Sequence, residues 1–343
     1  MKHLREDLPT EQAAATAAPS EQRRASPSCT RRQILLYGGM TTAVASVAGL
    51  GYWAFWDRTF GSRAAGMPDH RVTLPSTAPT IVVARGQDAG KNVAAALARF
   101  GGMGEFVGKA DRVLIKPNMG WNSAPAQAAN THPGVVAALV HACRDAGAQE
   151  IWVTDVPVDD AKDSFGRSGI HRAALEAGAK VILPQQSRYI QIPIPGMPGT
   201  WPLLELFTQA DKIINVPVAK AHSLTSVSAG MKNWFGVLGS QRMMLHTNID
   251  AALAGLTEMM KPTLTVVDAM RVLMRGRPGG GDLGNVKQVG AVAVSVDPVA
   301  ADAWAATAVG VPVGKVRGLV LAEQRNLGHA DLRTVSLVEI VTG

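Results

Sequence analysis

Short apolar runs alternate with helix-forming segments from residue 81 to the C-terminus, and this alternation constrains the fold more than any other feature. Buried strands are indicated at 81–83, 113–115, 151–153, 181–183, 213–216, 264–267, 291–296 and 335–340. Helical patterns are indicated at 91–100, 133–146, 170–177, 249–260, 298–308 and 316–326. Strands that alternate with helices predict an α/β fold with a mostly parallel sheet and helices on both faces. The alternating segment 189–194 predicts an edge hairpin, which would make the sheet mixed at its edge.

Polar residues follow the carboxyl ends of these predicted strands. They are Lys116, Asn118, Asp155, Lys220, His222, Asp268 and Asp297. In open α/β sheets the ligand crevice lies outside the carboxyl ends of the strands, so we expect a site there. An Asp after a strand also caps the next helix or makes a turn, and this alternative applies most directly to Asp297 before Pro298.

The densest polar segment follows the strand at 213–216 and has the sequence VPVAKAHSLTSVSAGMKNWFGVL, residues 216–238. It is expected to form a loop followed by a helix. Polar side chains directly after a buried strand are costly unless they bind a ligand or one another. The segment is therefore predicted to form one wall of a ligand site.

Three kinds of chemistry are open for this site. In an anion site, lysines and the loop 279–281 would hold a carboxylate or phosphate, with Asn118, Lys232, Asn233 and Asp155 as ligand-binding residues. In an acid–base site, the catalytic residues would be His222, Lys220 and Lys116. A lysine beside His222 would lower the pKa of the imidazole and leave it a neutral base.

A divalent metal ion is the third alternative. His132, His222, Asp268 and Asp297 are the candidate ligands, and His246 is a further histidine. No His-Glu-x-x-His or His-x-His spacing supports this set, and a histidine near a helix start is more often a cap. The cofactor therefore stays undetermined, with a divalent metal as one option.

The N-terminal part predicts export. Residues 1–29 are a polar leader expected to be disordered, and 30–56 carry Arg31-Arg32 before an uncharged apolar stretch at 34–56. This pattern is typical of a twin-arginine (Tat) signal, and the stretch is long enough to remain as an inner-membrane anchor. Residues 57–79 would be a tether and 80–343 the α/β domain. The Tat translocon and the membrane are thus expected partners, and the expected location is periplasmic or extracytoplasmic.

Cysteine content and charge exclude two classes. The chain has two cysteines, Cys29 and Cys143, and an iron–sulfur cluster held by cysteines needs about four thiolates. Cys143 lies in an apolar helical pattern and is expected to be buried away from the site. The net charge is +7, but no dense basic run interleaved with aromatic residues is present, so nucleic acid is not an expected partner.

Five segments in this order resemble the domain-of-unknown-function 362 (DUF362) family: residues 115–140, 151–155, 216–239, 264–270 and 294–304. The resemblance implies an α/β fold and a site at the motif positions, but no settled activity. The motif positions are Lys116, Asn118, His132, Asp155, Lys220, His222, Lys232, Asn233, Asp268 and Asp297. Many members carry a ferredoxin-like cluster segment, whose cysteines this chain lacks.

The function predicted from these observations is an exported α/β protein that binds a small anionic ligand, a carboxylate or a phosphate. Acid–base chemistry at His222 and the neighbouring lysines would make it an enzyme. The alternative is a non-catalytic periplasmic accessory protein that delivers a ligand or metal to a membrane partner. In either case Lys116, Asn118, His222, Lys232 and Asp268 are predicted to line one cavity.

Overall fold

The computed structural model describes residues 66–343. The leader, the Tat-type segment and the first residues of the tether lie outside the described residues. Within 66–343, no helix has the length and apolar character needed to cross a membrane.

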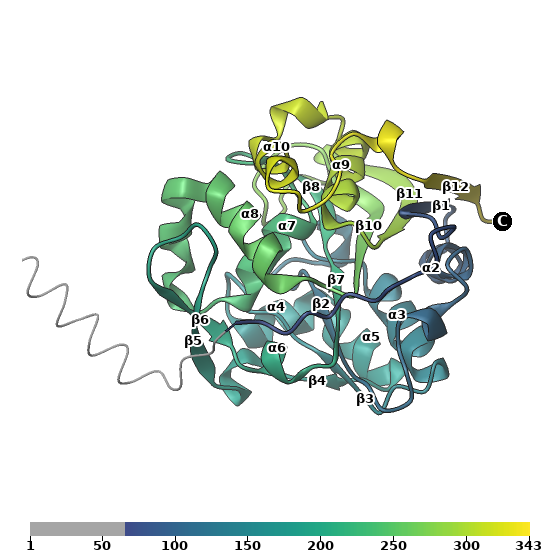
Figure 1. Cartoon of the computed structure of the whole chain (residues 1–343), viewed down its shortest axis with the longest axis horizontal. Helices are drawn as coiled ribbons and strands as arrows, with labels where there is room; N and C mark the ends of the chain where they lie inside the picture. Colours follow the sequence, from purple (N-terminus) through teal and green to yellow (C-terminus); the bar gives the residue numbers. More distant parts are fainter. Residues whose placement is uncertain (1–65) are drawn as a thin grey trace, which may run out of the picture. The chain divides into compact units, whose positions relative to one another are not determined.

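A mixed sheet forms the centre of the domain (Figure 1). Its main strands, in spatial order, are β12 (Leu337–Val341), β1 (Ile81–Arg85), β11 (Val286–Ser295), β10 (Leu264–Leu273), β7 (Lys212–Val216), β2 (Arg112–Pro117), β3 (Glu150–Val153) and β4 (Lys180–Val181). Strand β11 is antiparallel to both of its neighbours, β1 and β10, whereas the other pairs along this order are parallel. The predicted α/β class with a mostly parallel, mixed sheet is therefore confirmed, and the antiparallel strand β11 lies inside the sheet.

Both faces of the sheet are covered by helices. Val82 and Ala84 of β1 pack into one hydrophobic core, while Ile81 and Val83 pack into the other, as the two-residue period of a strand requires. The first core is closed by α2 (Ala89–Ala98), α3 (Pro133–Asp145), α4 (Ala161–Arg167) and α5 (Ile170–Ala177). The second is closed by α6 (Leu206–Gln209), α8 (Ile249–Met260), α9 (Pro298–Val309) and α10 (Arg317–Gln324).

Two expectations about local structure are wrong. The segment after β7 is not a loop before a helix, because β8 (Val218–His222) pairs parallel with β10 and antiparallel with β9 (Ser226–Ser228). Only the short helix α7 (Gly230–Asn233) follows. The hairpin of β5 (Tyr189–Pro193) and β6 (Thr200–Leu204) does form, but as a separate two-stranded sheet and not at the edge of the main one.

The direction of β11 determines where Asp297 lies. Ser295, at the end of β11, is paired with Ile81 and Thr265, at the beginnings of β1 and β10. Asp297 therefore lies beside the amino ends of the parallel strands, at the opposite end of the sheet from their carboxyl ends. Its side chain caps α9 by accepting hydrogen bonds from Val299 N at 2.8 Å and Ala300 N at 2.9 Å.

Candidate functional site

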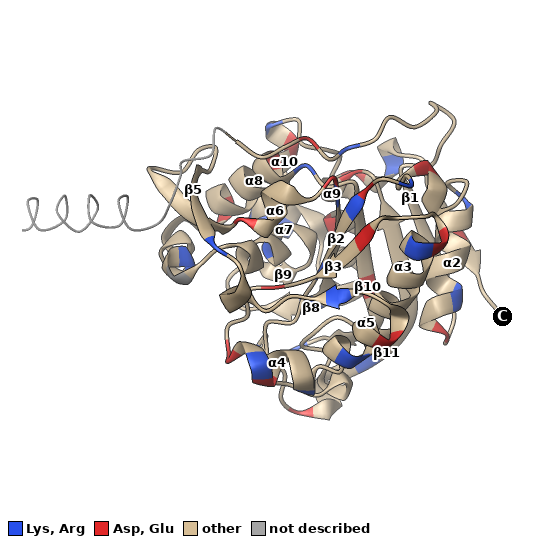
Figure 2. Ribbon diagram, turned by 90° about the horizontal axis from the view of Figure 1, so that it is seen from below, with Lys and Arg blue, Asp and Glu red and all other residues tan. Residues whose placement is uncertain are grey.

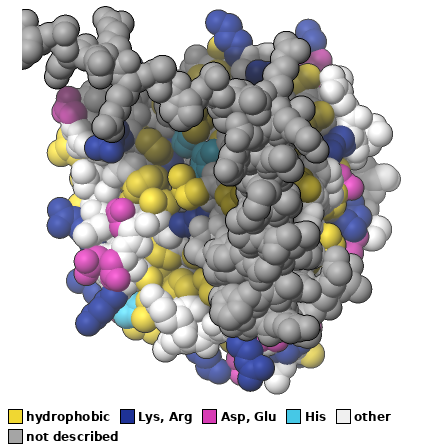
Figure 3. All heavy atoms as spheres, turned by 90° about the vertical axis from the view of Figure 1, so that its left-hand side faces the viewer, with side chains coloured by type: hydrophobic (Ala, Val, Ile, Leu, Met, Phe, Trp, Pro, Cys, Tyr) yellow, Lys and Arg dark blue, Asp and Glu magenta, His cyan; other side chains and the backbone are white. Residues whose placement is uncertain are grey.

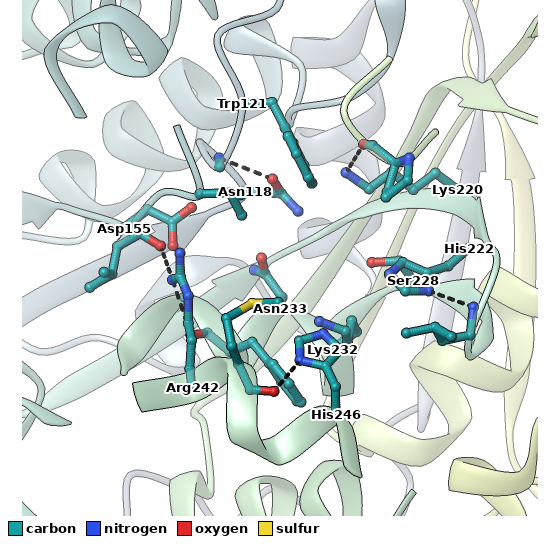
Figure 4. A pocket seen from close by; sticks show the side chains of 18 of the residues that line it. Asn118, Trp121, Asp155, Lys220, His222, Ser228, Lys232, Asn233, Arg242 and His246 are labelled. Atoms are coloured by element: carbon teal, nitrogen blue, oxygen red, sulfur yellow. Dashed lines mark hydrogen bonds between the residues drawn. The ribbon is translucent and has the colours of Figure 1, made fainter. Parts of the chain in front are cut away.

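A cavity of about 300 Å³ lies where β2, β3 and β8 end, and Figure 4 shows its side chains. Its basic and imidazole side chains are Lys116, Lys220, Lys232, Arg242, His222 and His246. Asp155 is the one acidic residue among the described residues that line it. Along the rest of the described ribbon, Figure 2 shows Lys and Arg interspersed with Asp and Glu, whereas the cavity has a single carboxylate.

Lys116 is fully occupied by protein groups. Its side chain is 1% exposed, and its Nζ lies 2.8 Å from Asp155 Oδ1, 2.8 Å from Asn233 Oδ1 and 3.1 Å from the carbonyl of Pro117. Asp155 is held in turn, because its Oδ2 accepts a hydrogen bond from Met119 N at 2.7 Å. Two of the three N–H donors of this ammonium are hydrogen-bonded and its charge is paired with Asp155, so Lys116 has little left to offer a ligand. Its contacts favour a positioning role over the catalytic role predicted from sequence.

Asn233 supports the same ion pair. Its Oδ1 accepts from Lys116, and its Nδ2 donates to Lys116 O at 3.2 Å and to Asn215 Oδ1 at 2.8 Å. Asn118 differs, because its Oδ1 accepts from Gly120 N at 3.2 Å and no described protein group accepts from its Nδ2. Of the two asparagines predicted to bind ligand, Asn118 is thus the one with donors to offer.

Lys220 is the middle residue of β8, and the described residues accept hydrogen bonds from two of its three N–H donors. Its Nζ donates to the carbonyls of Ala129 at 2.5 Å and Pro278 at 2.9 Å, and lies 5.7 Å from the centroid of the Trp121 ring. Burial, with the nearby charge of Lys232, lowers the pKa of Lys220 to about 7. Pro278 belongs to the loop before 279–281, so this loop contributes a carbonyl to the site.

Lys232 lies on α7 and makes no hydrogen bond or ion pair with any residue in 66–343. Its Nζ lies 3.6 Å from the centroid of the Phe235 ring, a cation–π contact that leaves the N–H donors available. Burial, with the charges of Arg242 and Lys116, lowers its pKa to about 7. Lys232 is therefore a partly buried cation whose charge the described residues do not compensate.

Arg242 was not predicted from the sequence. Its guanidinium donates to the carbonyls of Val156, Pro157 and Phe235, and burial lowers its pKa. It adds positive charge to the cavity while its own donors are directed to the backbone. No pattern marks it, because it lies in the 3-10 segment Ser240–Asn248 and does not follow a strand.

His222 presents a proton donor to the cavity. Its Nδ1 accepts from Leu224 N at 3.2 Å and Thr225 N at 3.4 Å, so the proton of the neutral ring is on Nε2. Burial, followed by the charges of Lys232 and Lys220, lowers its pKa to about 4. The predicted neutral state thus agrees with the lowered pKa, with burial as the largest cause. The tautomer makes Nε2 a hydrogen-bond donor and not the predicted base.

His246 has the opposite tautomer. Its Nδ1 lies 3.1 Å from the carbonyl of Met243, which can only accept, so the neutral ring carries its proton on Nδ1 and a lone pair on Nε2. The ring packs edge-on against Phe235 with centroids 5.3 Å apart, and burial lowers its pKa. In the described part of the site, His246 is the imidazole suited to accept a proton.

The four metal candidates do not come together, and among residues 66–343 no group of three or more His, Cys, Asp or Glu side chains is placed to hold a metal ion. His132 caps α3 through its Nδ1, which accepts from Gly134 N at 3.0 Å. Asp268 accepts from His132 N at 2.7 Å and Met270 N at 2.9 Å, inside a strand that continues to Leu273. Asp297 lies at the far edge of the sheet and also contacts His329 Nδ1 at 2.9 Å.

The predicted convergence is therefore correct for Lys116, Asn118, His222 and Lys232, all of which line the cavity, and wrong for Asp268. Asp268 does not end a strand as predicted: it is a buried residue within β10, and it accepts a hydrogen bond from His132 N at the start of α3. Cys143 is buried in α3, as expected, and does not line the cavity.

The fold and the site define an α/β protein with a positively charged cavity at the carboxyl ends of its parallel strands. The chain belongs to the DUF362 family, a domain of unknown function, whose model matches residues 113–307. The thylakoid-associated protein sll1697 of Synechocystis sp. is 32% identical over 222 residues, covering 59% of this chain and 64% of the relative. The match thus spans less than two thirds of that relative's length.

Two solved structures are similar in part. The lactate racemase apoprotein from Thermoanaerobacterium thermosaccharolyticum has a TM-score of 0.43 at 14% identity, covering 75% of this chain and 61% of its own. A Thermotoga maritima protein has a TM-score of 0.35 at 13% identity, covering 70% and 60%. At these scores the likeness does not bear on activity.

Proposed function

We propose that the protein binds a small organic anion, a carboxylate or a phosphate, in this cavity. The observation that carries the proposal is Lys232, a cation without a protein acceptor in 66–343, among three further basic side chains and a single carboxylate. Lys232 Nζ, the third donor of Lys220 and His222 Nε2–H would contact the anion. The proposal includes no metal ion, because the predicted metal ligands lie apart.

Electrostatics support an anion over a neutral ligand. Uncompensated cations in a partly buried site are destabilised by desolvation and by one another, which is why Lys220 and Lys232 have a lowered pKa. A bound anion would offset both effects and favour the protonated lysines. Anion binding should therefore be accompanied by proton uptake near pH 7.

Isothermal titration calorimetry with propionate, hexanoate and methanesulfonate tests this proposal. Lys232→Met should weaken anion binding by about 10- to 100-fold, the value of one or two charged hydrogen bonds. Lys287→Met is the matched control, because Lys287 is an exposed lysine of β11 that does not line the cavity. Unchanged affinity in Lys232→Met would contradict the proposal.

Catalysis is the second candidate, favoured by the tautomer of His246. A proton acceptor at His246 and the donors Lys232 and His222 in the same cavity would suit proton abstraction next to a bound carboxylate. His246→Asn keeps a donor for the Met243 carbonyl and removes the Nε2 lone pair. If the protein is an enzyme, solvent deuterium should enter the carbon next to the carboxylate of a bound ligand, and this exchange should fall in His246→Asn. A ligand that binds without exchange would favour the non-catalytic accessory protein.

For location we propose export through the Tat translocon, with residues 34–56 as a candidate membrane anchor. The relative named thylakoid-associated supports a membrane-associated compartment. Lysine at both Arg31 and Arg32 should retain the protein in the cytoplasm. Normal export of this variant would contradict Tat dependence.

A further inference from the structure

The mouth of the cavity is apolar, although its interior is charged. Val158, Leu224 and Met243 line the cavity and are 57%, 61% and 66% exposed, and we refer to them as the apolar rim. Further in, Trp121 and Phe235 provide aromatic walls. Figure 3 shows one face of the molecule, on which hydrophobic side chains gather beside histidines and a basic side chain.

The rim residues come from three separate segments. Val158 follows β3, Leu224 is in the turn between β8 and β9, and Met243 is in the 3-10 segment Ser240–Asn248. Single exposed apolar side chains are common on protein surfaces and need no explanation. Here three exposed apolar side chains from separate segments surround one charged cavity, so they form a cluster and are not scattered singly. They are placed to contact whatever enters.

We infer that the ligand is an amphipathic organic anion: a single anionic head group on an apolar body, such as an unbranched alkyl chain. This inference rests on the proposed anion site. The head group would contact Lys232 and His222, and the apolar body would lie between Trp121 and Phe235 and reach the apolar rim. With an inorganic anion or acetate bound, the apolar walls of the cavity would remain exposed to water.

The cavity size agrees with this class. Its volume of about 300 Å³ is at the lower end of ligand pockets, which run from about 300 to 1,000 Å³. Such pockets are mostly apolar, with a few polar groups that fix the orientation of the ligand. Here the polar groups are basic and lie deeper than the rim. The ligand would therefore enter with its anionic head group inside and its apolar body towards the rim.

The test is calorimetric titration of the full-length protein with straight-chain carboxylates from acetate to octanoate. Affinity should rise with chain length, by roughly fourfold for each methylene that becomes buried. The double variant Leu224→Gln, Met243→Gln should lose this gain for the longer chains while binding acetate as before. Leu175→Gln is the matched control, because Leu175 is 48% exposed on α5 and does not line the cavity. The rim side chains are exposed, and unchanged melting temperatures would show that the variants fold.

The outcomes separate the inference from the proposal on which it rests. Equal affinity for acetate and octanoate, with both weakened by Lys232→Met, would overturn the amphipathic ligand and leave the anion site standing. Octanol binding as tightly as octanoate, or octanoate binding unaffected by Lys232→Met, would overturn the anion site itself. An unreduced gain in affinity for the longer chains in the rim variant would also overturn the inference.

Discussion

Two lysines of one cavity differ in what their ammonium groups contact. Lys116 donates to two protein oxygens and forms an ion pair with Asp155, whereas Lys232 lies over the Phe235 ring and donates to none of the described residues. Both are lysines of the sequence motif. Only their surroundings distinguish Lys116 as a positioning residue from Lys232 as a ligand-binding one. The difference leads to opposite expectations for their substitution.

Lys116→Met should destabilise the fold strongly. It leaves the carboxylate of Asp155 buried beside an uncharged side chain, and breaking a buried ion pair at one end costs about 3–5 kcal/mol. The double variant Lys116→Met, Asp155→Leu removes both charges and should be less destabilised than Lys116→Met alone. Denaturant unfolding of both variants and of Asp155→Leu completes the cycle. A Lys116→Met protein as stable as the wild type would show that the pair does not hold this region.

His222 is expected to support function through one nitrogen and the turn through the other. An asparagine at this position can accept from Leu224 N and Thr225 N in place of Nδ1, but it has no group that replaces Nε2–H. His222→Asn should therefore change the free energy of unfolding by less than about 1 kcal/mol and still weaken anion binding by about tenfold or more. His222→Ala should also lose about 1 kcal/mol of stability from the two unpaired N–H groups. Tight anion binding by His222→Asn would exclude Nε2–H as a ligand contact.

The sequence located most of the site residues but not their bonding. Lys220 follows a predicted strand, and that position was sufficient to place it in the crevice. Its acceptors are the carbonyls of Ala129 and Pro278, which lie 91 and 58 residues away in the chain. Backbone oxygens in loops carry no sequence signal, so the number of free donors on each lysine required the structure.

At the scale of elements, α7 is held in place by α9. Asp302 accepts hydrogen bonds from Gly230 N at 2.6 Å and Met231 N at 3.0 Å, the first residues of α7. Gly230 allows this approach, since a Cβ there would lie 2.7 Å from Asp302 Oδ1. This contact fixes the helix that carries Lys232.

Asp302→Ala should leave two buried backbone N–H groups unpaired and destabilise the protein by about 2–4 kcal/mol. It should also weaken anion binding, because Lys232 loses its fixed position. Asp302→Asn keeps one acceptor oxygen and should show a smaller loss in both measurements. Thermal unfolding and calorimetric titration of the two variants check this order. An Asp302→Ala variant that unfolds less readily than Asp302→Asn would contradict it.

The sequence was least informative about strand direction. An apolar run predicts that a strand is buried, but not which way it runs relative to its neighbours. The prediction that Asp297 lies at the site fails for this reason, because β11 is antiparallel. The β8–β9 hairpin was missed for a related reason. Its charged and hydroxyl residues resemble a loop, although Lys220 is 1% exposed and pairs with Ser228.

At the scale of the whole molecule, the two cores and the cavity have opposite effects on stability. The cores bury both faces of the sheet, whereas the cavity gathers cations without enough acceptors. Functional sites often keep charged groups that destabilise the fold, and packing elsewhere in the protein offsets this loss of stability. The ionisation of these groups should therefore be visible in the pH dependence of unfolding.

The clearest window lies between pH 7 and pH 9. The pKa of Lys220 and of Lys232 falls from the ordinary 10.5 to about 7 on folding, so in this window the unfolded chain binds more protons than the folded one. Stability should consequently rise with pH, by up to about 1.4 kcal/mol per pH unit for each lysine. Below pH 7, the raised pKa of Asp302, about 7, contributes a fall in stability with rising pH. Above pH 9, the raised pKa of Cys143, about 12, contributes a fall of the same kind.

Denaturant unfolding at several pH values, with and without methanesulfonate, tests this expectation. The sulfonate keeps its own charge throughout the window, so any change in its effect reports on the protein. Bound to the protonated lysines, it should stabilise the protein more at pH 7 than at pH 9 and flatten the rise. Lys232→Met should reduce the slope of the ligand-free protein, while Lys287→Met should not. A ligand-free protein whose stability is constant or falls from pH 7 to pH 9 would mean that both lysines stay protonated, and the cavity would then contain a compensating negative charge.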